Sequence, residues 1–329
     1  MRWWSLLLAL ATTVAMRWWS LLLALATVVA VALLNAPILY FEQWSLREGK
    51  TPVLLDRPAR TEGQWVDDYF VVEPLDASTF AIGEPRYYQG NYSYLLVGAT
   101  RALLIDAGSG LRDLSPVVRA LTALPVTVIP SHLHFDHIGS IRRFDRVALP
   151  DVPVLRNRAA DGVLTLTRYE FLGAMDRLAP PAFQVNEWWA DGARVDLGGR
   201  TVEILHTPGH TPTSVSVWES SLHRLYAGDY LYPGELYAFL PGASLANYET
   251  TANRLLGLLP RDVRVYSAHM QEAPAVPAAP VMGYQDLQAL QKALRARRSG
   301  LADYEGFYPR RYPVTGSMTL ATGFPWNLR

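Results

Sequence analysis

Short apolar segments separated by turn-forming residues follow one another along most of the chain, after one much longer apolar segment at the N-terminus. Short apolar runs bounded by turn residues predict strands, whereas apolar residues spaced three or four positions apart predict helices. Strands are expected at 70–72, 79–82, 92–97, 101–105, 126–129, 146–149, 195–197, 201–205, 214–218, 224–227 and 263–267. Helices are expected at about 113–123, 138–144, 247–259 and 285–298, and in part of 157–177.

These elements form two half-units on either side of about residue 185, each with several strands and a helix or two. A strand face that is apolar must be buried, and so must the apolar stripe of a helix. The pattern therefore predicts an α/β protein in which two sheets pack face to face, with helices outside.

The long N-terminal segment carries no charged residue from Trp18 to Phe41. About 24 residues in a helix, at roughly 1.5 Å each, are enough to cross a hydrocarbon core of about 30 Å. Aromatic residues flank the segment, as they do at membrane interfaces. We expect a retained transmembrane anchor. A cleaved signal peptide is the alternative, because Ala30-Val31-Ala32 fits a small-x-small cleavage site.

The translation start and the membrane orientation are inferred from a sequence repeat and from the distribution of basic residues. The sequence from Met1 to Thr12 recurs unchanged from Met16 to Thr27, so we expect Met16 to be a usable start. Basic residues after the span favour a cytoplasmic location for the rest of the chain. A very short basic N-terminus before an apolar run favours export, and we expect an anchored protein whose folded part is exported.

Composition excludes several classes of protein. The 329 residues have a formal net charge of zero, which argues against a nucleic-acid-binding protein with a basic face. The sequence has no cysteine, so it has no disulfide, no thiolate metal ligand and no cysteine nucleophile.

The densest cluster of chemically active residues follows the expected strand at 126–129. His132, His134, Asp136 and His137 lie within six residues, and three of the chain's seven histidines are there. Imidazole and carboxylate groups are typical ligands of zinc and similar divalent ions. His132 and His134 share a face on an extended segment, whereas the adjacent Asp136 and His137 point apart. This geometry favours two neighbouring metals over one.

Further candidate ligands lie where other expected strands end. His210 follows a Pro-Gly turn after the strand at 201–205, Asp229 follows the strand at 224–227, and His269 follows the strand at 263–267. A buried carboxylate or imidazole without a partner is unfavourable, and one shared metal centre would supply that partner. Asp106 ends another apolar strand, before a glycine-rich turn.

In this order the motifs resemble those of the metallo-β-lactamase-fold hydrolases, over about residues 68–270. The resemblance implies an αββα sandwich of two mixed sheets flanked by helices, with the site at one edge of the sheets. It assigns His132, His134 and His210 to one metal and Asp136, His137 and His269 to the other, with Asp229 bridging both. It also implies that Asp106 orients the ligand histidines, and His206 and His223 match no ligand position.

The resemblance implies a hydrolase with two Zn²⁺ ions, for which iron or manganese are alternatives. Its nucleophile would be a metal-bridging hydroxide, with Asp136 accepting a hydrogen bond and shuttling the proton. Tyr232, three residues after Asp229, resembles a lactonase tyrosine that hydrogen-bonds the substrate carbonyl. Asp136 and Tyr232 are therefore the candidate catalytic residues.

The expected substrate is an ester-type carbonyl compound, such as a lactone, a thioester or a lipid-like acyl ester. The missing cysteine ligand and the bridging Asp229 argue against a true β-lactamase. A bridging aspartate is similar to the pattern of hydroxyacylglutathione thioester hydrolases, acyl-homoserine-type lactonases and the phosphodiesterases of the superfamily. Phosphodiesterases of the superfamily, and iron-dependent redox or sulfur enzymes with the same fold, remain alternatives. We expect a small-molecule substrate and a membrane contact as partners, without nucleic acid, and make no prediction of the oligomeric state.

The expected division of the chain has four parts. Residues 1–41 form the anchor or signal segment, and residues 42–67 a linker. Residues 68–275 form the catalytic domain, and residues 276–329 a helix and tail packed on its core.

Overall fold

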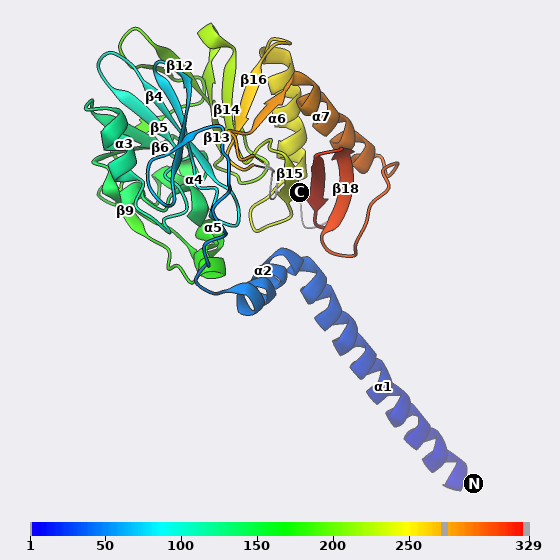
Figure 1. Cartoon of the computed structure of the whole chain (residues 1–329). Coiled ribbons are helices and arrows are strands. Elements are labelled where there is room, and N and C mark those ends of the chain that lie inside the picture. Colours follow the sequence, from blue (N-terminus) through cyan, green and yellow to red (C-terminus); the bar gives the residue numbers. More distant parts are fainter. Residues whose placement is uncertain (1, 271–275, 325–329) are drawn as a thin grey trace.

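The computed structural model describes residues 2–270 and 276–324 (Figure 1). Within these residues the strands form two large sheets, one three-stranded sheet and one two-stranded sheet. Met1, the end of the expected catalytic domain at residue 275 and the last residues of the expected tail lie outside the described residues.

The first large sheet has eight strands in the order β1-β2-β3-β4-β5-β6-β7-β10. They are β1 (Gln64–Trp65), β2 (Val71–Asp76), β3 (Thr79–Gly83), β4 (Tyr92–Val97), β5 (Ala102–Ile105), β6 (Val126–Ile129), β7 (Arg146–Pro150) and β10 (Glu187–Trp189). Neighbours from β1 to β5 are antiparallel, and those from β5 to β10 are parallel. The sheet is therefore mixed.

The second large sheet has six strands in the order β11-β12-β13-β14-β16-β17. They are β11 (Arg194–Asp196), β12 (Thr201–His206), β13 (Val215–Glu219), β14 (Arg224–Gly228), β16 (Arg264–Ser267) and β17 (Val281–Gly283). Only β14 and β16 run parallel in it, because helix α6 connects them.

The main core lies between these sheets and is built from alternate residues of each strand. Leu103 and Ile105 of β5 pack in one cluster with Val202 and Ile204 of β12. Leu104, between the first two, points to the opposite face and joins a second cluster. Side chains of a strand alternate between its two faces, so the apolar runs of the sequence supply two cores at once.

Helices cover the two outer faces. They are α3 (Ser115–Leu121), α4 (Pro153–Arg156) and α5 (Arg168–Phe171) beside the first sheet, and α6 (Leu245–Leu258) and α7 (Tyr284–Arg298) beside the second, with 3₁₀ turns η1 (Phe135–His137), η2 (Ile141–Arg143), η3 (Gly173–Asp176) and η4 (Ser220–Leu222). Leu255 of α6 and Leu290 of α7 are fully buried in the cluster that contains Val265 of β16. The αββα sandwich expected from the sequence is confirmed.

The remaining strands form two small sheets. One pairs β8 (Val163–Thr165) with β9 (Ala182–Gln184), and the other has the order β15-β19-β18, with β15 (Gly234–Ala238), β18 (Arg310–Thr315) and β19 (Met318–Thr322). Because β19 pairs in parallel with β15, the C-terminal segment is bonded to the loop region that follows Asp229. In the segment 157–177, where the sequence predicts a helix in part, the structure has only the short helix α5 and the turn η3, both after β8.

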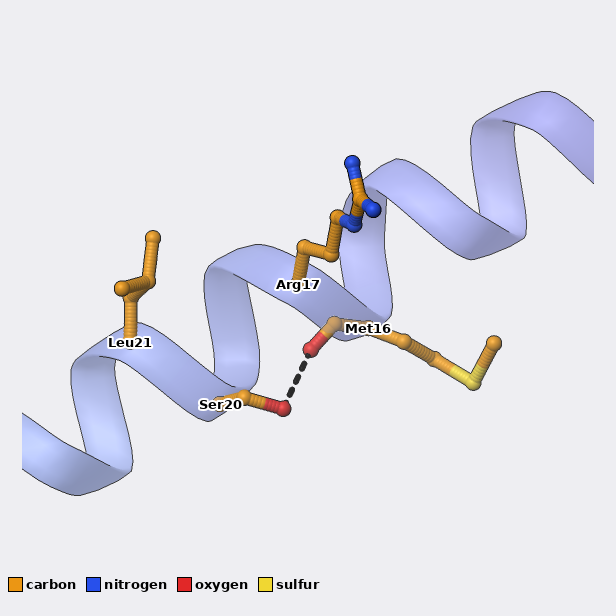
Figure 2. Close-up of a pocket in the computed structure, with 4 residues that line it drawn as sticks. All are labelled: Met16, Arg17, Ser20 and Leu21. Carbon is orange, nitrogen blue, oxygen red and sulfur yellow. Dashed lines mark hydrogen bonds between the residues drawn. The ribbon is translucent and has the colours of Figure 1, made fainter.

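Two helices precede the sandwich. Helix α1 (Arg2–Leu34) extends away from it, and α2 (Ala36–Glu48) turns back against it (Figure 1). Among the described residues, one stretch, Met16–Leu34, is long and apolar enough to cross a membrane, and none of it is buried. The hollow in Figure 2 is bounded by Met16, Arg17, Ser20 and Leu21 of this single helix, so it has no second wall that could enclose a ligand.

Helix α2 differs from the expectation that the apolar span runs unbroken to Phe41 and is followed by a linker. The helix restarts at Ala36-Pro37, where proline suits a first helical turn. Phe41 is completely buried, and Tyr40 and Trp44 pack against the same core cluster. The apolar character of these residues reflects burial against protein. The four-part division of the chain stays a prediction.

Candidate metal centre

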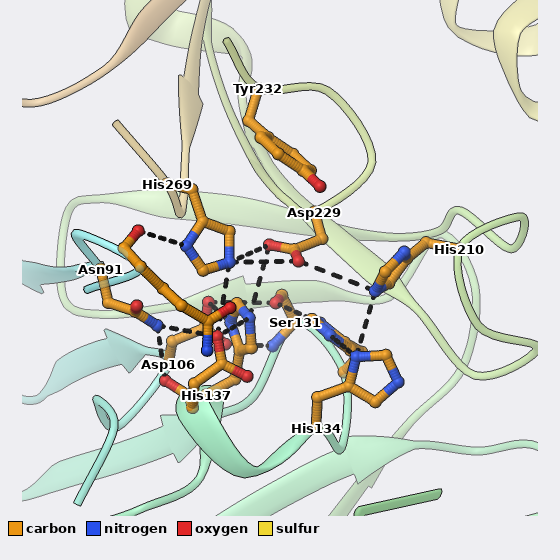
Figure 3. A network of polar contacts seen from close by, with 12 residues as sticks. Asn91, Asp106, Ser131, His134, His137, His210, Asp229, Tyr232 and His269 are labelled. Carbon is orange, nitrogen blue, oxygen red and sulfur yellow. Dashed lines mark hydrogen bonds and ion pairs between the residues drawn. The ribbon is translucent and has the colours of Figure 1, made fainter. Parts of the chain in front are cut away.

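The expected ligands converge at one edge of the sandwich, where strands from both sheets end (Figure 3). Strand β6 leads into His132 and His134, and turn η1 carries Asp136 and His137. His210 follows β12, Asp229 follows β14 and His269 follows β16. All seven side chains are buried. The structure therefore brings together every residue that the sequence singled out as a ligand, and their function as ligands stays a prediction.

The backbone at two strand ends adopts the left-handed conformation, which turns the chain into the site. Asp106 has φ 63° after β5, and Gly228 has φ 52° just before Asp229. A side chain at Gly228 would collide with the Ser131 hydroxyl group, so glycine is required there. The strained Asp106 backbone is held by its own carboxylate, which accepts hydrogen bonds from the Ser131 amide (2.6 Å) and hydroxyl (3.0 Å).

Three imidazole rings form the first group. His134 Nδ1 lies 2.9 Å from His132 Nε2 and 3.1 Å from His210 Nε2. Burial lowers the pKa of all three rings, so they are neutral at neutral pH. Three converging neutral nitrogens make a typical face for one zinc-like ion.

Two imidazoles and two carboxylates form the second group. His137 Nε2 lies 3.4 Å from both Asp136 Oδ2 and Asp229 Oδ1, and His269 Nε2 lies 3.1 Å from Asp229 Oδ1. Burial opposes a positive charge here, but the carboxylates raise the pKa of His137 and His269 above the usual range. The same pairing holds the pKa of Asp229 well below its usual range despite burial. The two carboxylates of this group therefore favour a bound positive charge, which either protons or a metal cation can supply.

Asp229 belongs to both groups. Its Oδ2 lies 3.7 Å from His210 Nε2 and 3.2 Å from His269 Nε2, and its Oδ1 lies 3.4 Å from His137 Nε2 and 3.1 Å from His269 Nε2. A carboxylate in that position can bridge two ions, as zinc and other divalent metals allow. Asp229 is therefore the residue that joins the two groups.

Hydrogen bonds on the far side of the rings orient three of the histidines. His137 Nδ1 donates to Asp106 Oδ2 (3.0 Å), His210 Nδ1 to the Tyr237 carbonyl (2.8 Å), and His269 Nδ1 to the Gln89 carbonyl (3.1 Å). A neutral imidazole that donates through Nδ1 has a bare lone pair at Nε2. These lone pairs all point into the site.

Two buried atoms in the centre test whether these residues fit a metal. His137 Nε2 and Asp229 Oδ1 have no hydrogen-bond partner, although they face each other at 3.4 Å. Unpaired buried polar atoms are unfavourable, and a cation between them would satisfy both. With nitrogen and oxygen donors and no thiolate, the residues fit zinc, iron or manganese.

Asn91 is a site residue that the sequence did not reveal. Its amide donates to the Asp136 backbone carbonyl (2.8 Å) and to Asp136 Oδ2 (3.0 Å). The residue is buried, and its chain segment bridges to His269. No spacing or motif marks it, since a single asparagine before a strand is common.

The remaining candidates lie as follows. Tyr232 is buried, with its ring 5.3 Å from that of His269, but its hydroxyl donates to the Glu235 carbonyl. His206 contacts the Pro212 carbonyl, and His223 pairs with Asp262, so neither joins the centre. The catalytic assignment of Tyr232 and Asp136 stays a prediction.

Comparison with known proteins agrees with this geometry. An acyl-coenzyme A thioesterase MBLAC2 from Gallus gallus is 29% identical over 215 residues, covering 59% of this chain and 77% of the relative. A hydroxyacylglutathione hydrolase from Aeromonas hydrophila is 25% identical over 188 residues, covering 55% of this chain and 62% of the relative.

Solved structures show the same fold. A metallo-β-lactamase from Pontibacter korlensis superposes with a TM-score of 0.51 at 17% identity, covering 69% of this chain and 99% of the other. The metallo-β-lactamase IND-7 gives the same score and identity, covering 70% and 100%. At this level of identity the likeness concerns the fold alone. The family model described as metallo-beta-lactamase superfamily matches residues 87–269, more than half of the chain and all seven candidate ligands, and the protein therefore belongs to the metallo-β-lactamase superfamily.

Proposed function

We propose that this protein is a dinuclear hydrolase that cleaves acyl thioesters or related acyl esters. As a member of its superfamily the chain is a metal-dependent hydrolase. The observation that supports the dinuclear assignment is the position of Asp229, whose carboxylate lies between His210 of the first group and His137 and His269 of the second. The acyl class is supported by the relatives, which are named acyl-coenzyme A thioesterase and hydroxyacylglutathione hydrolase.

In this proposal the ligands divide as the resemblance implies. His132, His134 and His210 would hold one ion, Asp136, His137 and His269 the other, and Asp229 would contact both. When bound, such a pair of divalent ions lowers the pKa of a water and polarises the carbonyl under attack. Zinc suits the donors best, and iron or manganese are alternatives.

The chain's own residues would supply the proton acceptor and the orientation. Burial opposes ionisation of Asp136, but His137 and His269 hold the pKa of its carboxyl well below the usual range. An ionised Asp136 can accept the proton of the attacking water. Tyr232 would donate to the substrate carbonyl only after its hydroxyl leaves the Glu235 carbonyl.

We also propose that α1 anchors the protein in a membrane with its folded part exported. The supporting observation is the apolar stretch Met16–Leu34, none of which is buried. Intact mass of the purified protein distinguishes a retained anchor from a signal peptide cut after Ala32, and a start at Met1 from one at Met16.

The test uses the purified full-length protein. Elemental analysis should find two divalent ions per chain, and chelation should abolish hydrolysis of thioesters until zinc is restored. The same preparation is assayed with lactones and phosphodiesters, which separate the other substrate classes of the superfamily. Wild-type rates from a metal-depleted sample would refute the proposal.

A matched pair of variants tests the bridging carboxylate. Asp229→Asn should lose at least one ion and lower kcat at least about 100-fold, because losing residues that merely support ligands already costs 10–100-fold. Asp262→Asn is the control, since Asp262 also pairs with a histidine but lies exposed and away from the centre. Equal metal content and rate in both variants would contradict a bridging role.

A further inference from the structure

We propose that the acyl group of the substrate occupies the apolar pocket beside His134, and that this pocket selects acyl groups of about six carbon atoms. The inference rests on the proposed function and adds the part of the substrate that the protein recognises. The pocket has a volume of about 170 Å³, and its walls come from five separate segments of the chain.

The pocket adjoins the metal centre through one side chain. His134 lines the pocket, and its Nδ1 lies within 3.1 Å of both His132 Nε2 and His210 Nε2. In this proposal, the substituent of a carbonyl held at the converging ligands extends past the His134 ring. The pocket is the space that such a substituent enters.

The walls suit an uncharged, apolar group. Leu133, Val154, Pro212 and Pro241 form much of the lining, and Glu170 is an acidic residue in it. Among the residues that the structure describes, no lysine or arginine lines it, so an anionic group such as a phosphate would find no counter-charge from them. The phosphate-bearing part of an acyl-coenzyme A would have to lie elsewhere.

Glu170 is already committed to other partners. Its carboxylate accepts hydrogen bonds from Arg158 Nη2 (2.9 Å) and from the Thr167 amide (2.9 Å). Burial works in the opposite direction, but these partners lower the pKa of the Glu170 carboxyl. Because its charge is paired at the wall, Glu170 does not require a polar ligand in the pocket.

The volume sets the length of chain that fits. An apolar cavity of about 150 Å³ holds one benzene molecule, which has six carbon atoms. A pocket of about 170 Å³ has room for a similar number. We expect longer chains to extend out past exposed lining residues such as Val154, which is 50% exposed, and to gain little further burial.

The experiment measures kcat/KM of the zinc-loaded full-length protein for thioesters of N-acetylcysteamine with acyl chains of two to twelve carbons. This small neutral thiol keeps the leaving group constant. We expect kcat/KM to rise about fourfold per methylene up to six carbons, which corresponds to about 0.8 kcal/mol each, and then to level off. A profile that is flat, or that keeps rising to twelve carbons, overturns the inference.

Variants of Val154 test whether the dependence on acyl-chain length arises in this pocket. Val154→Trp narrows the pocket and should lower kcat/KM for hexanoyl thioester at least tenfold while changing that for acetyl thioester less than threefold. Val154→Ala should shift the plateau to longer chains. Val281→Trp is the control, because Val281 is similarly exposed (44%) but lies on β17, outside the pocket. Equal losses on both substrates in Val154→Trp would contradict the inference.

The two proposals fail differently. If no thioester of any length is hydrolysed, the proposed function is wrong and the inference with it. If thioesters are hydrolysed without dependence on chain length or on residue 154, only the acyl pocket is wrong.

Discussion

Asn91 fixes the carboxylate of Asp136 from outside the set of candidate ligands. Both atoms that its amide contacts, the Asp136 carbonyl oxygen and Oδ2, only accept hydrogen bonds, so the amide nitrogen must face them. This arrangement leaves Asn91 Oδ1 buried without a partner, an unfavourable feature that the fold retains. We interpret Asn91 as a positioning residue for the second group of ligands.

We predict that Asn91→Ala weakens binding of one of two metal ions by about 10–100-fold, as losses of supporting hydrogen bonds do in other metal sites. Competition with a zinc chelator measures both affinities separately. Asn253→Ala, at an exposed position on α6, is the control and should keep both. Unchanged affinities in Asn91→Ala would show that Asp136 needs no such support.

The convergence of the candidate ligands could be predicted from the sequence, whereas the contacts that support them could not, for a physical reason. Histidine and aspartate rarely follow buried strands, so His132, Asp229 and His269 at such positions indicate a metal site. The partners of His210 and His269 are the backbone carbonyls of Tyr237 and Gln89, which any residue type would supply. Support of this kind depends on tertiary geometry and leaves no signal in residue types.

The sequence predicts that the first residues of helix α2 lie in a membrane, whereas the structure packs them against protein. A hydrophobic residue predicts burial, but it does not say whether lipid or protein buries it. Tyr40 packs on Phe239 with ring centroids 5.2 Å apart, and Trp44 packs on Tyr237 at 6.3 Å. Since the Tyr237 carbonyl orients His210, α2 braces a loop that contacts the metal centre.

We predict that Phe41→Ala lowers the free energy of unfolding by about 3–5 kcal/mol, the usual cost of truncating a buried phenylalanine. Leu39→Ala, two residues away and 50% exposed, should change it by less than about 0.5 kcal/mol. Denaturant unfolding of the detergent-solubilised protein measures both. Identical unfolding curves for the two variants would show that α2 does not contribute to the stability of the sandwich.

Turn η3 is tied to the loop before β4 through one buried carboxylate. Asp176 accepts hydrogen bonds from the hydroxyls of Tyr87 (2.6 Å) and Tyr88 (3.0 Å), in the loop that also carries Asn91. Burial raises the pKa of Asp176 to about 6, from an ordinary value of 3.8, with a smaller contribution from the charge of Asp136 and against the two hydrogen bonds. Its charged form is therefore unfavourable in the folded protein.

The sign of the pH dependence follows from that shift. A carboxyl whose pKa is higher in the folded chain binds more protons when folded, so its contribution is greatest below about pH 4 and is lost as pH rises through 6. We predict that Asp176→Asn raises Tm relative to wild type at pH 7 and loses this advantage at pH 4. Asp145→Asn, at an exposed position, should show a constant difference in thermal unfolding scans. A constant difference for Asp176→Asn as well would contradict the prediction.

At the scale of the whole molecule, α1 and the pocket are connected through α2. Glu42 on α2 accepts hydrogen bonds from Arg168 (2.8 Å) and Tyr169 (3.0 Å), and Tyr169 lines the pocket beside His134. Helix α2 follows α1 after a single residue, and α5, which carries Tyr169, lies on the side of the sandwich from which α1 extends (Figure 1). An anchored molecule would then present its pocket towards the bilayer, from which an apolar acyl chain can arrive.

This arrangement depends on α1 entering a bilayer, and the exposed middle of the helix allows a direct test. We predict that the full-length protein co-sediments with phosphatidylcholine vesicles and resists extraction by high salt. Leu25→Arg, at a side chain 61% exposed, should release most of it, since an arginine at the centre of a membrane helix costs about 2.5–3.5 kcal/mol in insertion. Leu222→Arg, at an exposed residue of η4, should leave sedimentation unchanged. If high salt releases the wild-type protein, or if Leu25→Arg co-sediments as fully as Leu222→Arg, α1 is not a membrane anchor. The orientation of the pocket would then not bring it close to a bilayer that supplies substrate.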